Sequence, residues 1–406
     1  MSTQHSISVT EAQSIILDVP KTPLRDLIPI HEARNRILGQ EMAALLSLPP
    51  TDKSLLDGYA LNLGEPPYKS RYRVVTESSA GHPTNRAFEV GECARISTGA
   101  VLPDSAQAVI AQEKVHRVQD CIEIEQEFAN QLQPGQFILK AGSDIVTNES
   151  LAIEPGHRLG PGEIALLAAC GHTQVPVFRK PTVAILSTGD ELAPIGSELG
   201  PGQIFSTNGL MLAGQILDAG AEVLSCVDIG DNEQDLENAL SAACEADIIL
   251  TSGGISVGDH DKVFPTLVRL GFDCKFRQVR LRPGKPTTFG NLGETLVFAL
   301  PGNPASSYVA CELFVRPLIQ KLLGRNKSAW FRPQRQVKLS SNIRADQQRS
   351  HFLRAIVSNQ SAQPLAHQLS GALTSLAGHN ALIGIPPNAD IMAGDLVWAL
   401  MLVDHL

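Results

Sequence analysis

The sequence lacks the signals that direct a protein into or across a membrane. Its first residues, MSTQHSISVTEAQ, do not place a basic segment before an apolar one. No uninterrupted apolar stretch approaches the roughly 18 residues that span a bilayer. Runs of positive charge are missing too. The chain has 33 Lys and Arg residues against 42 Asp and Glu residues, which gives a net charge of −9. These absences predict a cytoplasmic protein without a membrane or nucleic-acid partner, since polynucleotide binding depends on clustered positive charge.

Two further absences exclude classes of chemistry. The seven cysteines are scattered and form no C-x-x-C pair of the kind that binds zinc or makes a redox centre. We therefore expect reduced cysteines. No G-x-G-x-x-G follows the first strand of the predicted sheet, which disfavours a nicotinamide dehydrogenase.

Length and patterning predict a multidomain α/β chain. Its 406 residues exceed one compact core and suggest about three domains or more. Apolar runs alternate with helical patterns over 179–327, which predicts a central, doubly wound parallel sheet domain. Short β-type runs between turn residues predict an inserted β domain at 51–144 and a β-barrel-like domain at 328–406. Residues 1–50 and 145–178 are left as a mixed, helical N-terminal linker domain.

Local signals place helices in the predicted linker domain. Ser8 and Glu11 have the spacing of a capping box, which predicts a helix that opens the protein. A second helix is predicted over His31–Ile37. A third is predicted over Pro161–Cys170, with proline at its start and Gly171 after its end.

Polar, glycine-rich loops follow three strands of the predicted sheet. They read STGDE at 187–191, TSGGISVGDHDK at 251–262 and PGNPASS at 301–307. Because parallel strands end at one edge of a sheet, we expect these loops to line one crevice. A fourth segment, RPGKP at 282–286, offers two cations between prolines.

These residue types suit an oxyanion beside a hard cation. Glycine lets backbone N–H groups approach a phosphate closely. Asp259 and Asp261 could hold Mg²⁺, which takes oxygen ligands and shares them with substrate phosphates. The helix start after Pro304 would leave N–H groups for an anion.

Each loop also has a plainer interpretation. Asp190 and Ser306 are also consistent with helix caps, the prolines with stiff turns, and Arg282 and Lys285 with solvated surface charges. Three such loops after three strands of one sheet are much harder to explain this way. Together they predict a site for an anionic, phosphorylated small molecule.

Several strings in this order resemble one family closely. They are STGDEL, TSGGISVGDHD, RPGKP and LPGNPASS, with DGYA at 57–60, STGA at 97–100, RSHFLR at 349–354 and SGALTSLA at 370–377. The chain resembles the molybdopterin molybdenumtransferases, to which the E domain of gephyrin is related. The resemblance implies four domains and an elongated homodimer. It also implies that adenylylated molybdopterin and molybdate react, with Mg²⁺, to give molybdenum cofactor and AMP.

The resemblance also implies residue roles. Catalytic positions, the first three completing the cleft from a partner subunit, are Asp57, Thr98, Asp144, Glu191, Asp231, Asp261 and Lys285. Positions around the bound ligand are Ser187, Thr188, Gly189, Asp190, Ser252, Gly253, Gly254, Ser256, Gly258, Arg282, Pro301, Gly302, Asn303, Pro304 and Ser306. Metal ligands are Asp261, Glu191 and Asp259.

The sequence departs from the family pattern at Lys53, Leu56, Asn232 and Asp259. These departures bear on the metal ligands and on the choice between molybdate and tungstate. Two other functions stay open: molybdopterin adenylylation by a related sheet domain, and a non-catalytic scaffold that binds molybdopterin. The sequence favours metal transfer, because the adenylylating relatives lack the other domains and no second module extends this chain. Contacts with a molybdopterin adenylyltransferase and with molybdoenzymes are further expectations.

Overall fold

The computed structural model describes residues 6–255 and 262–402, which separate into two compact units. The first unit holds the chain up to Asp26, the short piece Pro155–His157, and the chain from Val177 onward. The second holds Leu27–Glu154 and Arg158–Pro176. Strands β1 (Arg25–Pro29) and β10 (Gln174–Phe178) pair where the chain passes between the units. The finer division into four domains stays a prediction.

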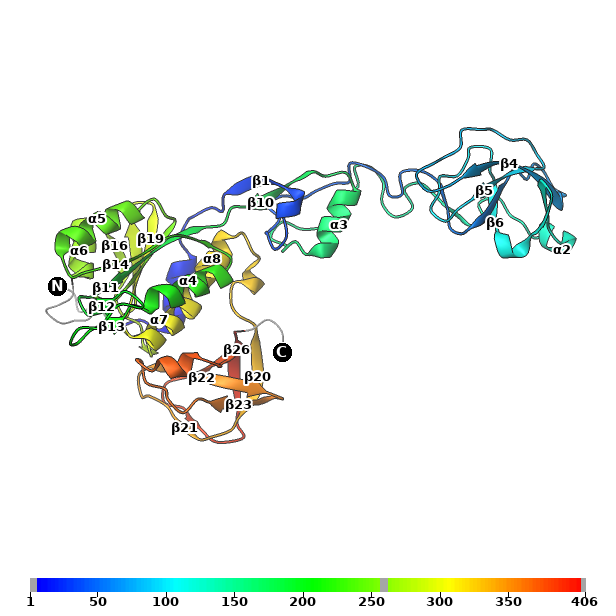
Figure 1. Ribbon diagram of the computed structural model, residues 1–406. Helices are drawn as coiled ribbons and strands as arrows, with labels where there is room; N and C mark the ends of the chain where they lie inside the picture. Colours follow the sequence, from blue (N-terminus) through cyan, green and yellow to red (C-terminus); the bar gives the residue numbers. More distant parts are fainter. Residues whose placement is uncertain (1–5, 256–261, 403–406) are drawn as a thin grey trace. The chain divides into compact units, whose positions relative to one another are not determined.

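A six-stranded sheet forms the centre of the first unit (Figure 1). Four neighbouring strands are parallel, which confirms the predicted central parallel sheet. Two antiparallel strands, absent from the prediction, extend it at one edge. In spatial order the strands are β14 (Glu222–Ile229), β11 (Thr182–Thr188), β15 (Ile248–Ser252), β19 (Thr295–Leu300), β18 (Thr288–Leu292) and β16 (Asp273–Phe276).

Helices cover both faces of this sheet, as Figure 1 shows. On one face, Leu240 of α5 and Leu267 of α6 pack into a core with Ile249 and Val297 of the central strands. Burial on both faces explains why the central strands read as continuous apolar runs. The helices are α5 (Glu233–Ala243) and α6 (Val263–Arg269) on that face, and α4 (Asn208–Asp218), α7 (Pro304–Ala310) and α8 (Arg316–Leu322) on the other.

Two predicted helices differ in detail from the structure. The apolar pattern of Phe205–Ala219 predicts a helix, but the helix begins only at Asn208, because Ile204–Phe205 (β13) pairs with Leu192–Ala193 (β12). The long helix expected from Pro304 is present, but a π-helical segment, Cys311–Val315 (η3), separates α7 from α8.

The C-terminal strands close into a five-stranded barrel, which confirms the predicted β-barrel-like fold. The order β22-β23-β20-β26-β24 is closed by a second pairing of β22 with β24. Leu353, Ile383 and Val397 fill the interior with their neighbours. A short strand from the sheet region, β17 (Leu281–Arg282), adds to β22. The barrel strands are β20 (Gln334–Leu339), β22 (Ser350–Ser358), β23 (Ser361–Pro364), β24 (Ala381–Ile385) and β26 (Leu396–Met401).

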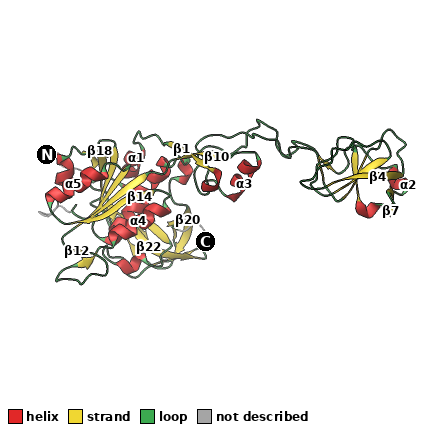
Figure 2. Cartoon of the chain, turned by 45° about the horizontal axis from the view of Figure 1, so that its top comes forward, coloured by secondary structure: helices red, strands yellow, loops and turns green. Residues whose placement is uncertain are grey.

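The second unit contains a six-stranded sheet of its own, seen mainly as strands in Figure 2. Tyr59, Tyr72 and Ile122 belong to its buried core. The predicted β runs at 72–75, 108–110 and 121–124 all lie in strands of this sheet. In spatial order these are β6 (Ala108–Ala111), β3 (Gly58–Leu61), β5 (Glu92–Ile96), β4 (Arg71–Ser78), β8 (Cys121–Glu123) and β7 (His116–Val118).

The helix predictions outside the sheets had mixed outcomes. Helix α1 (Val9–Leu17) begins with the predicted capping box, and α3 (Pro161–Ala169) begins with the predicted proline. The helix over His31–Ile37 is wrong, because only a 3₁₀ turn, Ile30–Glu32 (η1), forms there. Asn35 takes a left-handed φ of 63° and bonds through its N–H to the Leu159 carbonyl, which ends the helical geometry.

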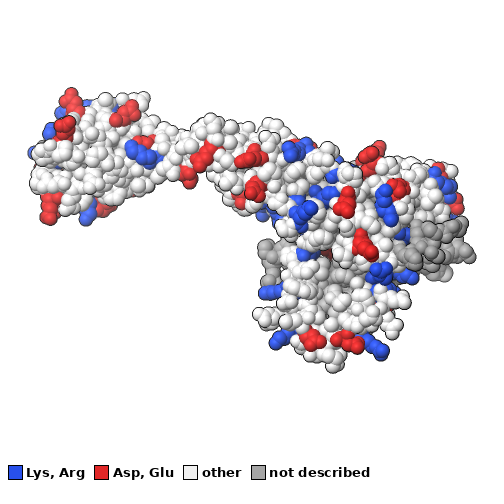
Figure 3. Space-filling model, turned by 180° about the vertical axis from the view of Figure 1, so that it is seen from behind, with Lys and Arg blue, Asp and Glu red and all other residues white. Residues whose placement is uncertain are grey.

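The surface of the described residues agrees with the charge balance of the sequence. On the face in Figure 3, Lys and Arg side chains are interspersed with Asp and Glu side chains. No helix within 6–255 or 262–402 is long and apolar enough to cross a membrane.

The barrel buries a histidine whose titration should be visible in stability. His351 lies on β22, is 7% exposed, and burial lowers its pKa to about 4, with Arg282 and Arg354 adding repulsion. Because the pKa of His351 in the folded protein lies below the ordinary 6.5, the fold favours the neutral imidazole. The stability that depends on this neutral state is present above pH 6.5 and is lost as the pH falls towards 4.

We expect the unfolding free energy of His351→Gln to decrease by roughly 1–3 kcal/mol less than that of wild type between pH 7 and pH 4, as measured by urea unfolding. The exposed His31→Gln serves as the control. Equal acid sensitivity of His351→Gln and wild type would contradict the assignment.

Candidate ligand pocket at the carboxyl edge of the sheet

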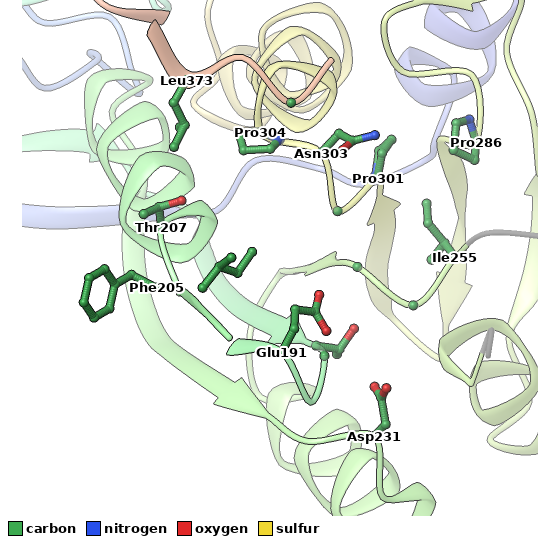
Figure 4. A pocket seen from close by; sticks show the side chains of 17 residues that line it. Glu191, Phe205, Thr207, Asp231, Ile255, Pro286, Pro301, Asn303, Pro304 and Leu373 are labelled. Carbon is green, nitrogen blue, oxygen red and sulfur yellow. The ribbon is translucent and has the colours of Figure 1, made fainter. Parts of the chain in front are cut away.

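A pocket of about 900 Å³ opens at the carboxyl edge of the parallel strands (Figure 4). The loops after β11, β14, β15 and β19 all contribute to its wall, as the parallel arrangement predicts. Strand β13, the turn before α4 and a loop of the C-terminal barrel complete it. Lining residues are Thr188, Gly189, Glu191, Ile204, Phe205, Thr207, Asp231, Gly253, Gly254, Ile255, Pro286, Pro301, Gly302, Asn303, Pro304, Gly371 and Leu373.

Glycines bring the loop backbones into contact in this pocket. Gly253 has a φ of +104°, and a Cβ there would lie 2.4 Å from the backbone oxygen of Thr188. A Cβ on Gly302 would lie 3.4 Å from the Cα of Gly253. The loops that follow β11, β15 and β19 are thus packed backbone against backbone, a spacing that larger residues would not permit.

Among the residues that the structure describes, the pocket is lined by two charged side chains, and both are acidic. Glu191 and Asp231 point their carboxylates into the same open space in Figure 4. Asp190, beside Glu191, instead accepts a hydrogen bond of 2.7 Å from the Asp231 N–H. Asp190 therefore ties the β11 loop to the β14 loop and positions Asp231.

Behind the pocket, several predicted ligand-binding hydroxyls serve the fold. Ser252 Oγ accepts a 2.9 Å hydrogen bond from Asn208 Nδ2, and that same nitrogen donates to the Gly302 carbonyl at 2.7 Å. Ser307 donates to the Pro301 carbonyl. Neither Ser252 nor Ser306 lines the main pocket.

The start of α7 does not offer the free N–H groups that the sequence suggested. The Ala305 N–H donates to the Ser370 carbonyl of the barrel at 3.0 Å. The N–H groups of Ser306 and Ser307 both donate to the Asn303 carbonyl. Proline supplies no donor at the first position, so the prediction of an anion site at this helix start is wrong.

The barrel loop that reaches the pocket is held by a buried arginine. Arg354 is fully buried, and its guanidinium donates to the Ser375 hydroxyl at 2.9 Å and to the Leu369 carbonyl at 3.2 Å. Burial lowers its pKa to about 10. Arg354 thereby fixes both ends of the segment that presents Gly371 and Leu373 to the pocket.

Some predicted residues lie elsewhere. Arg282 and Lys285 are exposed and do not line the pocket, although their neighbour Pro286 does. Asp57 and Thr98 lie in the second unit, where the Thr98 N–H donates to the Asp57 carboxylate at 2.7 Å and lowers its pKa. Asp144 is exposed in the same unit. Ser256, Gly258, Asp259 and Asp261 lie outside the described residues.

A metal site with three or more His, Cys, Asp or Glu ligands does not occur within 6–255 and 262–402. The predicted metal ligand Glu191 lines the pocket together with Asp231. Other predicted metal ligands fall in the segment not described.

Sequence reasoning missed part of the wall. Ile204 of β13 lies just before the helix expected from Phe205, Thr207 lies within that expected helix, and both reach the pocket. Leu373 belongs to the SGALTSLA string, which supported the resemblance without a role. The hydrogen bond from the Ala305 N–H of α7 to the Ser370 carbonyl joins two distant segments. Neither segment alone carries a sequence signal that predicts it.

Comparison with known proteins covers nearly the whole chain. Family models match as MoeA N-terminal region (domain I and II) over 7–171, probable molybdopterin binding domain over 184–321 and MoeA C-terminal region (domain IV) over 336–402. A molybdopterin molybdenumtransferase 2 of Mycobacterium tuberculosis is 32% identical, covering 97% of this chain and 99% of its own. The molybdopterin molybdenumtransferase of Bacillus subtilis is 33% identical, covering 94% and 90%.

A solved structure agrees. The molybdopterin biosynthesis MoeA protein from Pyrococcus horikoshii has a TM-score of 0.85 at 30% identity, covering 99% of this chain and all of that one. Fold and pocket thus define a multidomain α/β protein with a molybdopterin-binding type of sheet domain. The chain belongs to the molybdopterin molybdenumtransferase family.

The contact between glycine loops predicts a steric test. Gly253→Ala places a Cβ against the Thr188 backbone oxygen and also strains a left-handed residue. We expect a loss of roughly 1–3 kcal/mol in unfolding free energy together with a distorted pocket.

Gly196→Ala is the matched control, because Gly196 has a φ of +86° and nothing within 4 Å of its Cβ position. Thermal unfolding of both variants separates backbone strain from collision. Equal losses in the two would contradict the close packing of the loops.

Proposed function

We propose that this protein inserts molybdate into adenylylated molybdopterin and releases AMP, giving molybdenum cofactor. The observation that carries this proposal is the pocket itself, where loops with the family strings STGDEL, TSGG and LPGNP meet at one sheet edge. An oxygen nucleophile, from water or molybdate, attacks the adenylyl phosphorus, and the phosphate of molybdopterin leaves. The pocket must therefore hold two anions beside each other.

Charge is the main physical problem for such a reaction. Both reactants are anions, and the described charged lining residues, Glu191 and Asp231, are acidic as well. Arg282, at the end of β17, and Lys285, directly before the lining residue Pro286, are exposed cations of the same segment. A bound divalent cation would reduce the remaining repulsion.

The donor set fits Mg²⁺. The Glu191 and Asp231 carboxylates line one pocket, and neither has a side-chain hydrogen bond or ion pair recorded within the described part of the chain. Two carboxylates combined with substrate phosphates are a usual Mg²⁺ site. We propose that these residues, with Asp261 and Asp259, hold the ion, which when bound polarises phosphoryl oxygens.

Removing one carboxylate tests this. Glu191→Gln keeps the size of the side chain and removes its charge, so we expect kcat/KM for molybdenum insertion to fall roughly 100-fold and half-saturation to need more Mg²⁺. The assay follows AMP release with purified adenylylated molybdopterin and molybdate.

Glu198→Gln is the control, because Glu198 is an exposed carboxylate outside the pocket lining. Full turnover and an unchanged Mg²⁺ requirement in Glu191→Gln would refute this role.

Incubation with ATP and molybdopterin but no molybdate addresses the alternative: an adenylylated product would favour the preceding adenylylation step.

We further propose a homodimer in which Asp57, Thr98 and Asp144 complete the partner's cleft. An apolar surface in the first unit supports association. On α4, Leu210 and Leu217 are 64% and 60% exposed, and Leu224 on the edge strand β14 is 51% exposed. Exposed sheet edges with large apolar side chains are normally covered.

Leu217→Glu should therefore shift the protein from dimer to monomer in sedimentation velocity, because it places a charge in the apolar surface. Leu396→Glu, at an equally exposed leucine of the barrel, should leave the dimer intact. Dimers of unchanged stability in Leu217→Glu would exclude this surface.

A cytoplasmic location and contacts with an adenylyltransferase and molybdoenzymes complete the proposal.

A further inference from the structure

A small side cavity of about 60 Å³ adjoins the main pocket and shares Thr188, Glu191, Ile204 and Thr207 with it. The two also share Phe205, Gly302 and Pro304. The remaining wall comes from the ends of two central strands, from Leu192 of β12 and from Ser206 and Asn208 at the start of α4. Since a water molecule occupies about 30 Å³, the cavity has room for about two waters or for one edge of a ring. We call it the side cavity.

Three residues that line the side cavity have a buried polar atom without a hydrogen-bond partner among the described residues. They are Ser187 Oγ, on a residue that is 1% exposed, Thr188 Oγ1 and Asn208 Oδ1. A buried polar group that makes no hydrogen bond destabilises the folded protein. Gly209 lets the serine hydroxyl lie beneath α4, since a Cβ there would be 3.1 Å from Ser187 Oγ.

The orientation of the Asn208 amide follows from its other contacts. Its Nδ2 donates to the Gly302 carbonyl at 2.7 Å and to Ser252 Oγ at 2.9 Å. A carbonyl only accepts hydrogen bonds, so the nitrogen must face Gly302 and Oδ1 must be the unpaired acceptor. The side cavity therefore presents an acceptor from Asn208 and a hydroxyl from Ser187, which can donate or accept.

This set of groups disfavours an anion. A phosphate or molybdate oxygen would oppose the lone pairs of Asn208 Oδ1, and the Glu191 carboxylate lines the same cavity. Of the other serine hydroxyls in its wall, Ser206 donates to Asp228 at 2.6 Å, and Ser252 accepts from Asn208. What fits is a neutral group that carries an N–H donor next to an acceptor.

We infer that the side cavity binds the amino-bearing edge of a nitrogen heterocycle of the substrate, with Asn208 Oδ1 accepting from an N–H and Ser187 Oγ donating to the neighbouring ring acceptor. This inference rests on the proposed function, whose substrate contains two such rings, a pterin and an adenine. It assigns Ser187 and Asn208 to ring recognition and leaves the phosphates to the glycine loops and the Glu191 and Asp231 wall.

Ser187→Ala tests the inference, because the hydroxyl makes no protein hydrogen bond that the variant could lose. We expect the melting temperature of the ligand-free protein to stay equal or rise, whereas the Kd for the ring ligand rises roughly 3- to 10-fold. A purely structural serine would not produce these opposite effects. Titration calorimetry of the full chain with AMP and, separately, with pterin shows which ring enters.

A second comparison uses the ligand. Purine riboside monophosphate lacks the amino group of AMP, so if adenine enters, wild type should bind it more weakly than AMP. The difference should persist in Ser187→Ala, because Asn208 Oδ1 and not the serine accepts from the amino group. Thr251→Val is the matched control, since Thr251 Oγ1 is also buried and unpaired but lines neither cavity. It should bind both rings as wild type does.

Wild-type affinity of Ser187→Ala for both AMP and pterin would overturn the inference. Failure of the proposed function would appear differently. In that case the wild-type protein would insert no molybdenum, whatever the binding measurements show.

Discussion

The pocket depends on one constraint, which is that four neighbouring strands run parallel and end at the same sheet edge. Each strand end delivers a different loop to that edge. Glycine permits the closest contact between them, because a Cβ on Gly253 would lie 2.4 Å from the Thr188 carbonyl oxygen, whereas Gly302 is within ordinary van der Waals range of Gly253. Close backbone packing leaves the carboxylates of Glu191 and Asp231 at the surface of the pocket. Their direction is therefore set by the sheet.

The C-terminal barrel is part of the same construction. Ser370 supplies the carbonyl that the start of α7 requires, and His379 packs edge-on against Tyr308 at 5.0 Å between ring centres. Arg354 alternates with the interior residues Leu353 and Ala355, so it holds the intervening segment from the outer face of β22 by donating to Ser375 and to backbone carbonyls. Burial of a guanidinium is costly unless its donors are paired, so these hydrogen bonds link barrel stability to the pocket wall.

The pocket divides chemically into two regions. One wall has glycine backbone and the carboxylates of Glu191 and Asp231, which suits phosphates accompanied by a cation. The side cavity next to it shares Glu191 and adds neutral groups, the Ser187 hydroxyl and the Asn208 amide. A substrate with charged linkages and neutral rings matches such a division, because each part meets groups of complementary character.

Local sequence signals determined the elements and their order. Apolar runs located β11, β15 and β19, a capping box located α1, and the polar loops after the strands located most of the pocket wall. Each of these signals lies within about ten residues, the range over which propensity and periodicity act. The resemblance of the strings then identified the family across the chain.

The tertiary structure decided what depends on contacts between distant segments. It placed antiparallel strands β18 and β16 on the sheet, closed the barrel through β22 and β24, and paired Ala305 with Ser370 so that the α7 start lost its free donors. It also left Ser187 and Asn208 unpaired beside one cavity. A sequence shows which groups can form hydrogen bonds, but only packing decides which of those groups find a partner within the protein.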